Sequence, residues 1–167
     1  MKRFHDLLIE LNACEDAVRW AGDMTIEEVV KTCHRGDWML WLAARIQIDH
    51  RKLTLAKAYC VNTVRHMMKD ERSIKAVDTA IAYGEGEETE QDLKQVADAA
   101  NAAYAYYAYA DSAAAAAYYA AAAADAAAYA AYADAAYAKK KNQLQTAQIC
   151  REYIGQDIID KVNEIIR

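Results

Sequence analysis

The side chains of this chain that could do chemistry fall into three groups, and the largest lies in an alanine-rich segment. Positions 97–138 hold 27 Ala, nine Tyr, four Asp, one Asn and one Ser. His, Cys, Lys, Arg, Glu and Thr are all missing from these positions. Phenol rings stack and donate hydrogen bonds, and sparse carboxylates accept them. The segment therefore predicts a contact surface and not a reaction centre.

Seven of these side chains are regularly spaced, with separations of 3, 4, 7, 7, 4 and 3 residues. They are Tyr104, Tyr107, Asp111, Tyr118, Asp125, Tyr129 and Tyr132. On a continuous helix they occupy one stripe about 80° wide. The stripe is a candidate binding surface. Alternatively, its rings fill the space that small Ala side chains leave between helices. Both interpretations hold if the helices that pack together belong to different subunits.

The second group is an aromatic stretch that follows Cys33. Arg35 precedes Trp38 and Trp41, which are three residues apart and therefore share one face of a helix. We expect the two tryptophans to anchor the core. The alternative is a binding patch made of Arg35, Trp38 and Trp41.

The third group is the densest basic cluster, formed by Arg65, His66, Lys69, Arg72 and Lys75. On consecutive helices, Arg65, Arg72 and Lys75 are candidates for holding an anionic ligand or an acidic partner. A solvated charged face is the simpler interpretation of such a cluster.

None of these groups predicts an enzyme, a metal site or a cofactor. Asp111 and Asp125 are separated by about 21 Å along one helix, too far to act as a catalytic pair unless the chain folds back. The four cysteines form no CxxC, and they have no metal-ligand spacing with the histidines. We expect a non-enzymatic protein without cofactor or metal, whose cysteines are buried, reduced thiols.

The elements that must position these groups are helices. The 167 residues include no Pro, only five Gly and 55% hydrophobic residues, and no useful length of strand alternation. We predict an all-α fold, a single-domain multi-helix bundle over 1–167. It comprises amphipathic helices in 1–88, an Ala/Tyr/Asp-rich helical segment in 89–141 and C-terminal helices in 142–167. The middle segment is either one long helix or an antiparallel pair that breaks at Asp111-Ser112.

Local signals predict where individual helices begin and end. Thr25, Asp37, Asp49 and Thr89 are expected N-caps or helix starts, and Gly22 is expected to end the first helix. Lys139–Lys141 are expected to complement the C-terminal end of a helix. The predicted helices outside the middle segment span about 2–19, 25–34, 38–46, 49–68, 70–83, 143–154 and 156–166.

The net charge and the residue pattern argue against several classes of partner. The net charge is −5 and neither half of the chain is basic, so duplex nucleic acid is not an expected partner. The Asp residues that recur in the alanine-rich segment argue against a membrane span. The N-terminus lacks a signal-peptide pattern, and we expect a cytoplasmic location. Ala-only faces would form a large apolar patch on a monomer, which predicts a homo-oligomer.

Three stretches give the chain a resemblance to a known group. They are residues 35–42, residues 72–77 leading to 82–86, and the alanine-rich segment, spanning together about 30–155. They resemble small alanine/tyrosine-rich proteins of bacteriophages and bacteria, akin to immunity proteins of the Imm-5-like type. This chain departs from that pattern by lacking a Pro beside Arg72 and by its high Tyr content. The resemblance implies an all-helical phage or mobile-element protein that acts by binding inside a bacterial host cell.

Three functions are compatible with these observations. The leading hypothesis is a binding or inhibitory protein that neutralises a toxin or a host defence component by occlusion. The alternative is an oligomeric sponge that sequesters a nucleotide immune signal, as an anti-defence protein. An ice-binding or structural assembly protein is a lesser alternative, because ice recognition would be expected to use Thr and not Tyr.

Overall fold

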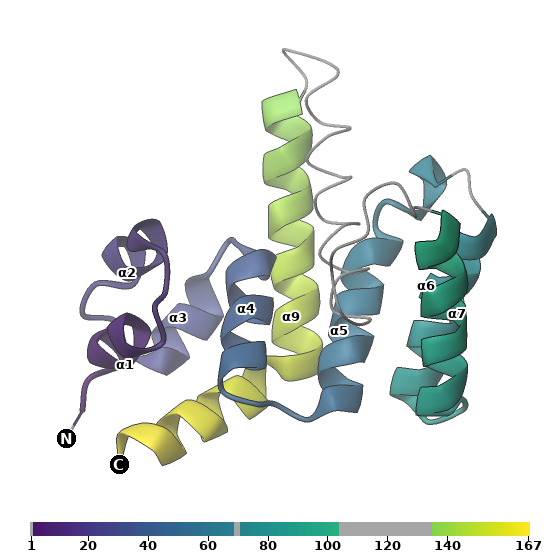
Figure 1. The fold of residues 1–167 in the computed structure, drawn as a ribbon. Coiled ribbons are helices and arrows are strands. Elements are labelled where there is room, and N and C mark those ends of the chain that lie inside the picture. The colour runs from purple at the N-terminus through teal and green to yellow at the C-terminus, as the bar shows by residue number, and fades with distance from the viewer. Residues whose placement is uncertain (1, 69–70, 104–134) are drawn as a thin grey trace.

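A computed structural model describes residues 2–68, 71–103 and 135–167, and these parts of the chain are helical without any strand (Figure 1). The all-α prediction is confirmed. The elements in chain order are α1 (Phe4–Glu10), α2 (Glu15–Ala21), α3 (Ile26–Thr32), α4 (Gly36–Arg45), α5 (His50–Asn62), the short 3-10 helix η1 (Arg65–Met67), α6 (Glu71–Glu85), α7 (Glu90–Ala103) and α9 (Ala135–Ile166).

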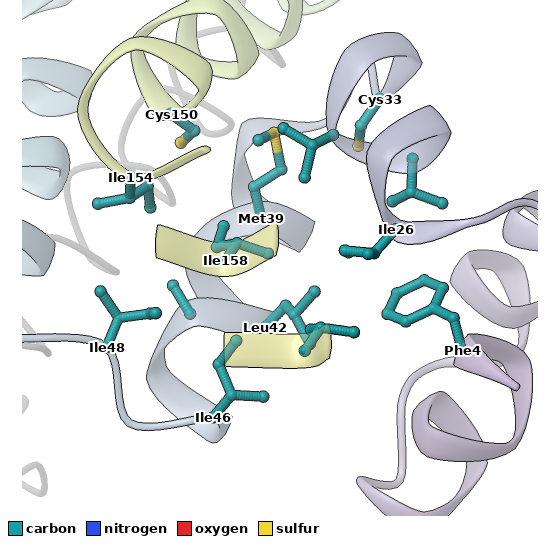
Figure 2. Packing of buried hydrophobic residues seen from close by; sticks show 14 of the residues in the cluster. Phe4, Ile26, Cys33, Met39, Leu42, Ile46, Ile48, Cys150, Ile154 and Ile158 are labelled. Carbon is teal, nitrogen blue, oxygen red and sulfur yellow. The ribbon is translucent and has the colours of Figure 1, made fainter. Parts of the chain in front are cut away.

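The long C-terminal helix α9 forms the centre of the bundle. Five of its side chains have no exposed surface, and they are Ala147, Cys150, Ile154, Ile158 and Val162. Separations of three and four residues place all five on one helix face. This helix packs against α3, α4 and α5. Figure 2 shows Ile158 in the same cluster as Met39 and Leu42 of α4.

The other helices are arranged around this centre. Figure 1 shows α4 on one side of α9 and α5 on the other. Helix α6 packs on α5, and α7 packs on α6, so these two helices lie farther from α9. At the opposite side, α1 adds Phe4, Leu7 and Leu8 to the core, and α2 packs against α1. None of the helices in the described ranges has both the length and the apolar character of a membrane span.

Three predicted helix starts are confirmed by their side-chain hydrogen bonds. The Thr25 hydroxyl accepts the backbone N–H of Glu28 at 3.3 Å, and the Glu28 carboxylate accepts the Thr25 N–H at 2.8 Å. Asp49 accepts the N–H of Lys52 at 3.0 Å. Thr89 and Asp92 satisfy each other's backbone N–H in the same way as Thr25 and Glu28. Such caps involve residues close in sequence, which is why the sequence alone shows them.

The predicted first helix over 2–19 is wrong, because the chain breaks there into α1 and α2. Asn12 has φ 58° and interrupts the helix in the left-handed region, which Asn tolerates better than most residues. Helix α2 then begins at Glu15 and ends before Gly22, whose φ is 50°. The predicted stop at Gly22 is therefore confirmed.

Asp37 is not the N-cap of α4. The helix begins one residue earlier, at Gly36, and Asp37 lies in its first turn. A side chain at Gly36 would have its Cβ 2.6 Å from Thr146 of α9. The start of α4 therefore lies directly on the α9 backbone, a contact between distant segments that local capping signals do not reveal.

The C-terminal region contains one helix where two were predicted. Helix α9 continues through Gly155 and also through Lys139–Lys141, which therefore mark no helix end. A Cβ at Gly155 would lie 3.2 Å from Cγ1 of Val30, so this glycine lets α3 come close to α9. Helix α5 is shorter than predicted, because it ends at Asn62 and η1 follows. The choice between one helix and an antiparallel pair concerns 104–134, outside the described residues.

Gly84→Ala should destabilise the protein although Ala favours helix. A Cβ at Gly84 would lie 2.5 Å from the Cβ of Leu55 and 3.0 Å from its Cα, so α5 and α6 would have to separate. We expect a loss of about 1–3 kcal/mol in the free energy of unfolding, measured by urea denaturation. Gly155→Ala is the matched control: its nearest contact is a Val30 methyl group that can shift, and the loss should be smaller. Equal losses in the two variants would contradict the close α5–α6 approach.

Candidate binding surface

Four side chains from α2, the turn before α4 and α4 itself form what we call the aromatic surface: Trp20, His34, Arg35 and Trp38. The ring centroids of Trp20 and Trp38 are 5.9 Å apart, with the rings tilted by 51°. The His34 ring meets both indoles edge-on, at 5.6 Å from Trp20 and 6.0 Å from Trp38. The Arg35 guanidinium carbon lies 4.7 Å from the centroid of Trp38. The geometry is that of ring stacking and cation–π contact.

The tryptophans of this region are shared between the core and the surface. Trp20, Trp38 and Trp41 are half-buried and pack against the central cluster, whereas His34 is exposed. The prediction that Trp38 and Trp41 anchor the core is thus only partly right. The residues that α4 buries fully are others, chiefly Met39, Leu42 and Ala43.

Helix α9 holds the turn that carries Arg35. The Arg151 guanidinium donates a hydrogen bond to the carbonyl of Cys33 at 2.7 Å. The Cys150 thiol donates to the carbonyl of Gly36 at 3.5 Å. Burial raises the pKa of the Cys33 thiol within the same turn. The backbone before and after Arg35 is therefore fixed to α9, the helix at the centre of the bundle.

The Arg35 side chain is held in place as well. Its Nε donates to Oδ1 of Asp37 at 2.8 Å, and Nη2 donates to Oδ2 at 2.5 Å. A bidentate pair of this kind fixes the plane of the guanidinium group. Trp41 repeats the motif one turn further along α4, where the Arg45 guanidinium carbon lies 5.6 Å from its ring centroid. The residues of the predicted patch therefore lie on α4 and at its N-cap: Trp38 and Trp41 in the helix and Arg35 just before it.

The predicted basic cluster is divided by the structure. The Arg65 guanidinium forms a two-point ion pair with the Asp78 carboxylate, with one N–O distance of 2.8 Å, and this holds the pKa of Asp78 below its usual range. Arg72 and Lys75 instead line a hollow of about 320 Å³ between α6 and α7, together with Gln95 and Val96. Lys69 lies outside the described residues. Arg65 is therefore not among the residues that line the hollow with the other two cations.

The predictions for the alanine-rich segment and for the cysteines have different outcomes. The stripe of Tyr and Asp residues from Tyr104 to Tyr132 lies wholly outside the described residues, so its role remains a prediction, as does the homo-oligomer expected from the Ala-only faces. The cysteines are only partly as expected. All four are free thiols, but Cys14 is exposed and Cys60 half-buried, and only Cys33 and Cys150 are buried.

A metal site is not apparent in the described parts of the chain, where no group of three or more His, Cys, Asp or Glu residues could hold an ion. A hollow of about 280 Å³ between α9 and the turn before α5 has acidic residues in its lining. Two of its carboxylates already have cationic partners, because Asp157 pairs with Lys52 and Glu164 pairs with Lys161.

Sequence reasoning missed Trp20 and His34 as parts of the aromatic surface, and Arg45 as the partner of Trp41. Trp20 lies eighteen positions before Trp38, on a different helix, and the two rings meet only in the folded chain. One signal was available: Trp20 is one of only three tryptophans, and an indole on a short amphipathic helix is an obvious candidate for contact with the other two.

Comparison with known proteins adds no family to this description. No protein-family model significantly matches the chain, and neither does any curated protein or solved structure.

The contact between Trp20 and Trp38 should be visible in solution. Two indoles at this distance and tilt couple their excited states, and we expect an exciton couplet in the circular dichroism spectrum. Trp20→Phe and Trp38→Phe should each abolish the couplet. Trp41→Phe is the control, because the structure shows no contact of its ring with another indole among the described residues, and it should leave the couplet in place. A couplet that survives Trp38→Phe would show that these rings do not meet.

Proposed function

We propose that this chain is a non-enzymatic helical protein that binds and inhibits a protein partner by covering part of its surface. The observation that carries the proposal is the aromatic surface, where two half-exposed indoles and an arginine are held rigidly. The resemblance of the sequence to phage and bacterial immunity proteins suggests the class of partner, which is a toxin or a component of host defence.

The composition and the rigidity of this surface both favour a protein partner. Trp and Arg are the residue types most enriched among those that dominate the energy of protein interfaces. Binding costs least when the contact side chains are already ordered. Here Asp37 orients Arg35, and α9 fixes the backbone on both sides of it. The surface therefore meets a partner with little further loss of conformational entropy.

The titratable groups of the aromatic surface support binding more than catalysis. The His34 ring packs edge-on against two indoles, and the Asp37 carboxylate forms an ion pair with Arg35. Each group is thus used to build the surface itself. On this argument the activity is inhibition by occlusion, and the homo-oligomer expected from the sequence would present several copies of the surface.

Trp38→Ala should weaken the binding of a partner captured by the wild-type protein. Tagged full-length protein is used to capture partners from the bacterial host, and the dissociation constant of any purified partner is then measured by calorimetry. We expect Trp20→Ala and Trp38→Ala each to weaken binding by roughly 30-fold or more, the effect of removing an interface residue worth about 2 kcal/mol.

Leu144→Ala is the matched control for these variants. Leu144 is an exposed apolar residue on α9, with 48% of its surface accessible, and its removal should leave binding unchanged. Circular dichroism establishes that each variant keeps its helical content. Binding by Trp38→Ala at the wild-type affinity would refute the role of the aromatic surface.

A second function, sequestration of a nucleotide signal, is favoured by one observation. Arg72 and Lys75 lie at the same hollow between α6 and α7, where a phosphate group could be held by both cations. If this hollow binds nucleotides, a panel of cyclic dinucleotides should raise the melting temperature of the wild-type protein. Lys75→Ala should lose the increase, and Lys161→Ala, far from the hollow, should keep it. The absence of any increase across the panel would exclude this function.

A further inference from the structure

The strongest unexplained feature of the bundle is a pair of cysteines from distant parts of the chain. Cys60 of α5 and Cys150 of α9 place their sulfur atoms 4.0 Å apart, although they are 90 positions apart in sequence. We propose that Cys60 and Cys150 form a reversible disulfide when the protein meets hydrogen peroxide. This inference is independent of the function proposed above.

The two cysteines differ in exposure, and this assigns their roles. Cys60 is half-buried, whereas Cys150 has no exposed surface. The contact with Cys60 and burial both raise the pKa of the Cys150 thiol, and burial keeps an oxidant in solvent away from it. Cys60 is therefore the sulfur that peroxide reaches, and Cys150 is the one that completes the bond.

The reaction proceeds in two balanced steps. The Cys60 thiol loses its proton and its sulfur attacks one oxygen of hydrogen peroxide, giving Cys60 sulfenic acid and one water molecule. The Cys150 sulfur then attacks the sulfenic sulfur. The sulfenic hydroxyl leaves with the Cys150 proton as a second water molecule, and the S–S bond forms. Peroxide accepts the two electrons that the two thiols lose.

The surroundings allow the sulfurs to approach each other. A disulfide requires a sulfur–sulfur distance of about 2.05 Å, so the pair must close by about 2 Å. The interactions given up are weak: Cys60 donates to the carbonyl of Thr146 at 3.8 Å, and Cys150 to that of Gly36 at 3.5 Å. The new bond would join α5 to α9 and enclose the intervening alanine-rich segment in a covalent loop.

The remaining thiols give the reaction its specificity. Cys33 is buried, and its thiol donates to the carbonyl of Arg35 at 3.3 Å. Cys14 is exposed at the start of α2 and can form disulfides between molecules. A test of the Cys60–Cys150 pair therefore uses the full-length protein with Cys14→Ser.

The experiment counts thiols and identifies the bond that forms. The folded Cys14→Ser protein is treated with hydrogen peroxide, the peroxide is removed by catalase, and remaining thiols are alkylated in denaturant and counted by mass spectrometry. We expect the count to fall from three to one, a linked peptide containing Cys60 and Cys150, and full recovery of thiols with dithiothreitol.

Two further variants separate this pairing from its competitors. Cys60→Ser added to Cys14→Ser removes the reactive sulfur, and the two buried thiols should then survive the same treatment. Cys33→Ser added to Cys14→Ser is the matched control, and it should still lose two thiols. Retention of all three thiols by the Cys14→Ser protein would overturn the proposal. So would a Cys33–Cys150 linkage, or oxidation of Cys60 that stops short of a disulfide.

Discussion

The structure depends on the fully buried strip of α9. Its five residues run from Ala147 to Val162, and they supply the surface on which α3, α4 and α5 pack. The strip is graded in size: Ala147 and Cys150 are small, and the residues that follow are Ile or Val. Where it is narrow, the start of α4 approaches so closely that Gly36 leaves no room for a side chain beside Thr146. Where it is wide, the large apolar side chains of α3 and α4 fill the space around it (Figure 2).

The geometry of the aromatic surface follows from this packing. Because α4 begins against α9, the turn before it comes within reach of Arg151 and Cys150, and both donate hydrogen bonds to its carbonyl groups. These two hydrogen bonds fix the conformation of the turn, and the turn positions the side chains that it carries. Helix α2 completes the surface from the other side by bringing Trp20 to Trp38. A rigid exposed surface therefore arises from a buried helix that is more than a hundred residues away in the sequence.

What the sequence predicts correctly is local, and what it misses depends on contacts between distant segments. The caps at Thr25, Asp49 and Thr89 involve residues three positions apart, and the structure confirms all three. At Gly155 the sequence prediction fails. A glycine ordinarily weakens a helix, so the sequence predicts a helix end there. Helix α9 nevertheless continues through Gly155, which packs closely against Val30 of α3. Arg35 and Trp38 are likewise close in sequence and could be proposed from their spacing, whereas the contact of Trp20 with Trp38 joins separate helices and was missed.

Helix α9 also links the aromatic surface to the cysteine pair. The relative strengths of its two hydrogen bonds to the turn show how closely the surface and the pair are coupled. Cys150 donates to the carbonyl of Gly36 and lies beside Cys60, so forming the disulfide removes one hydrogen bond from the turn. That bond has a thiol donor and is therefore a weak one. The bond from Arg151 to Cys33 has a charged donor and a length of 2.7 Å, which makes it the stronger of the two, and oxidation leaves it intact. The covalent link between α5 and α9 therefore changes the stability of the bundle more than it changes the shape of the surface, and the two proposed properties of this protein can vary separately.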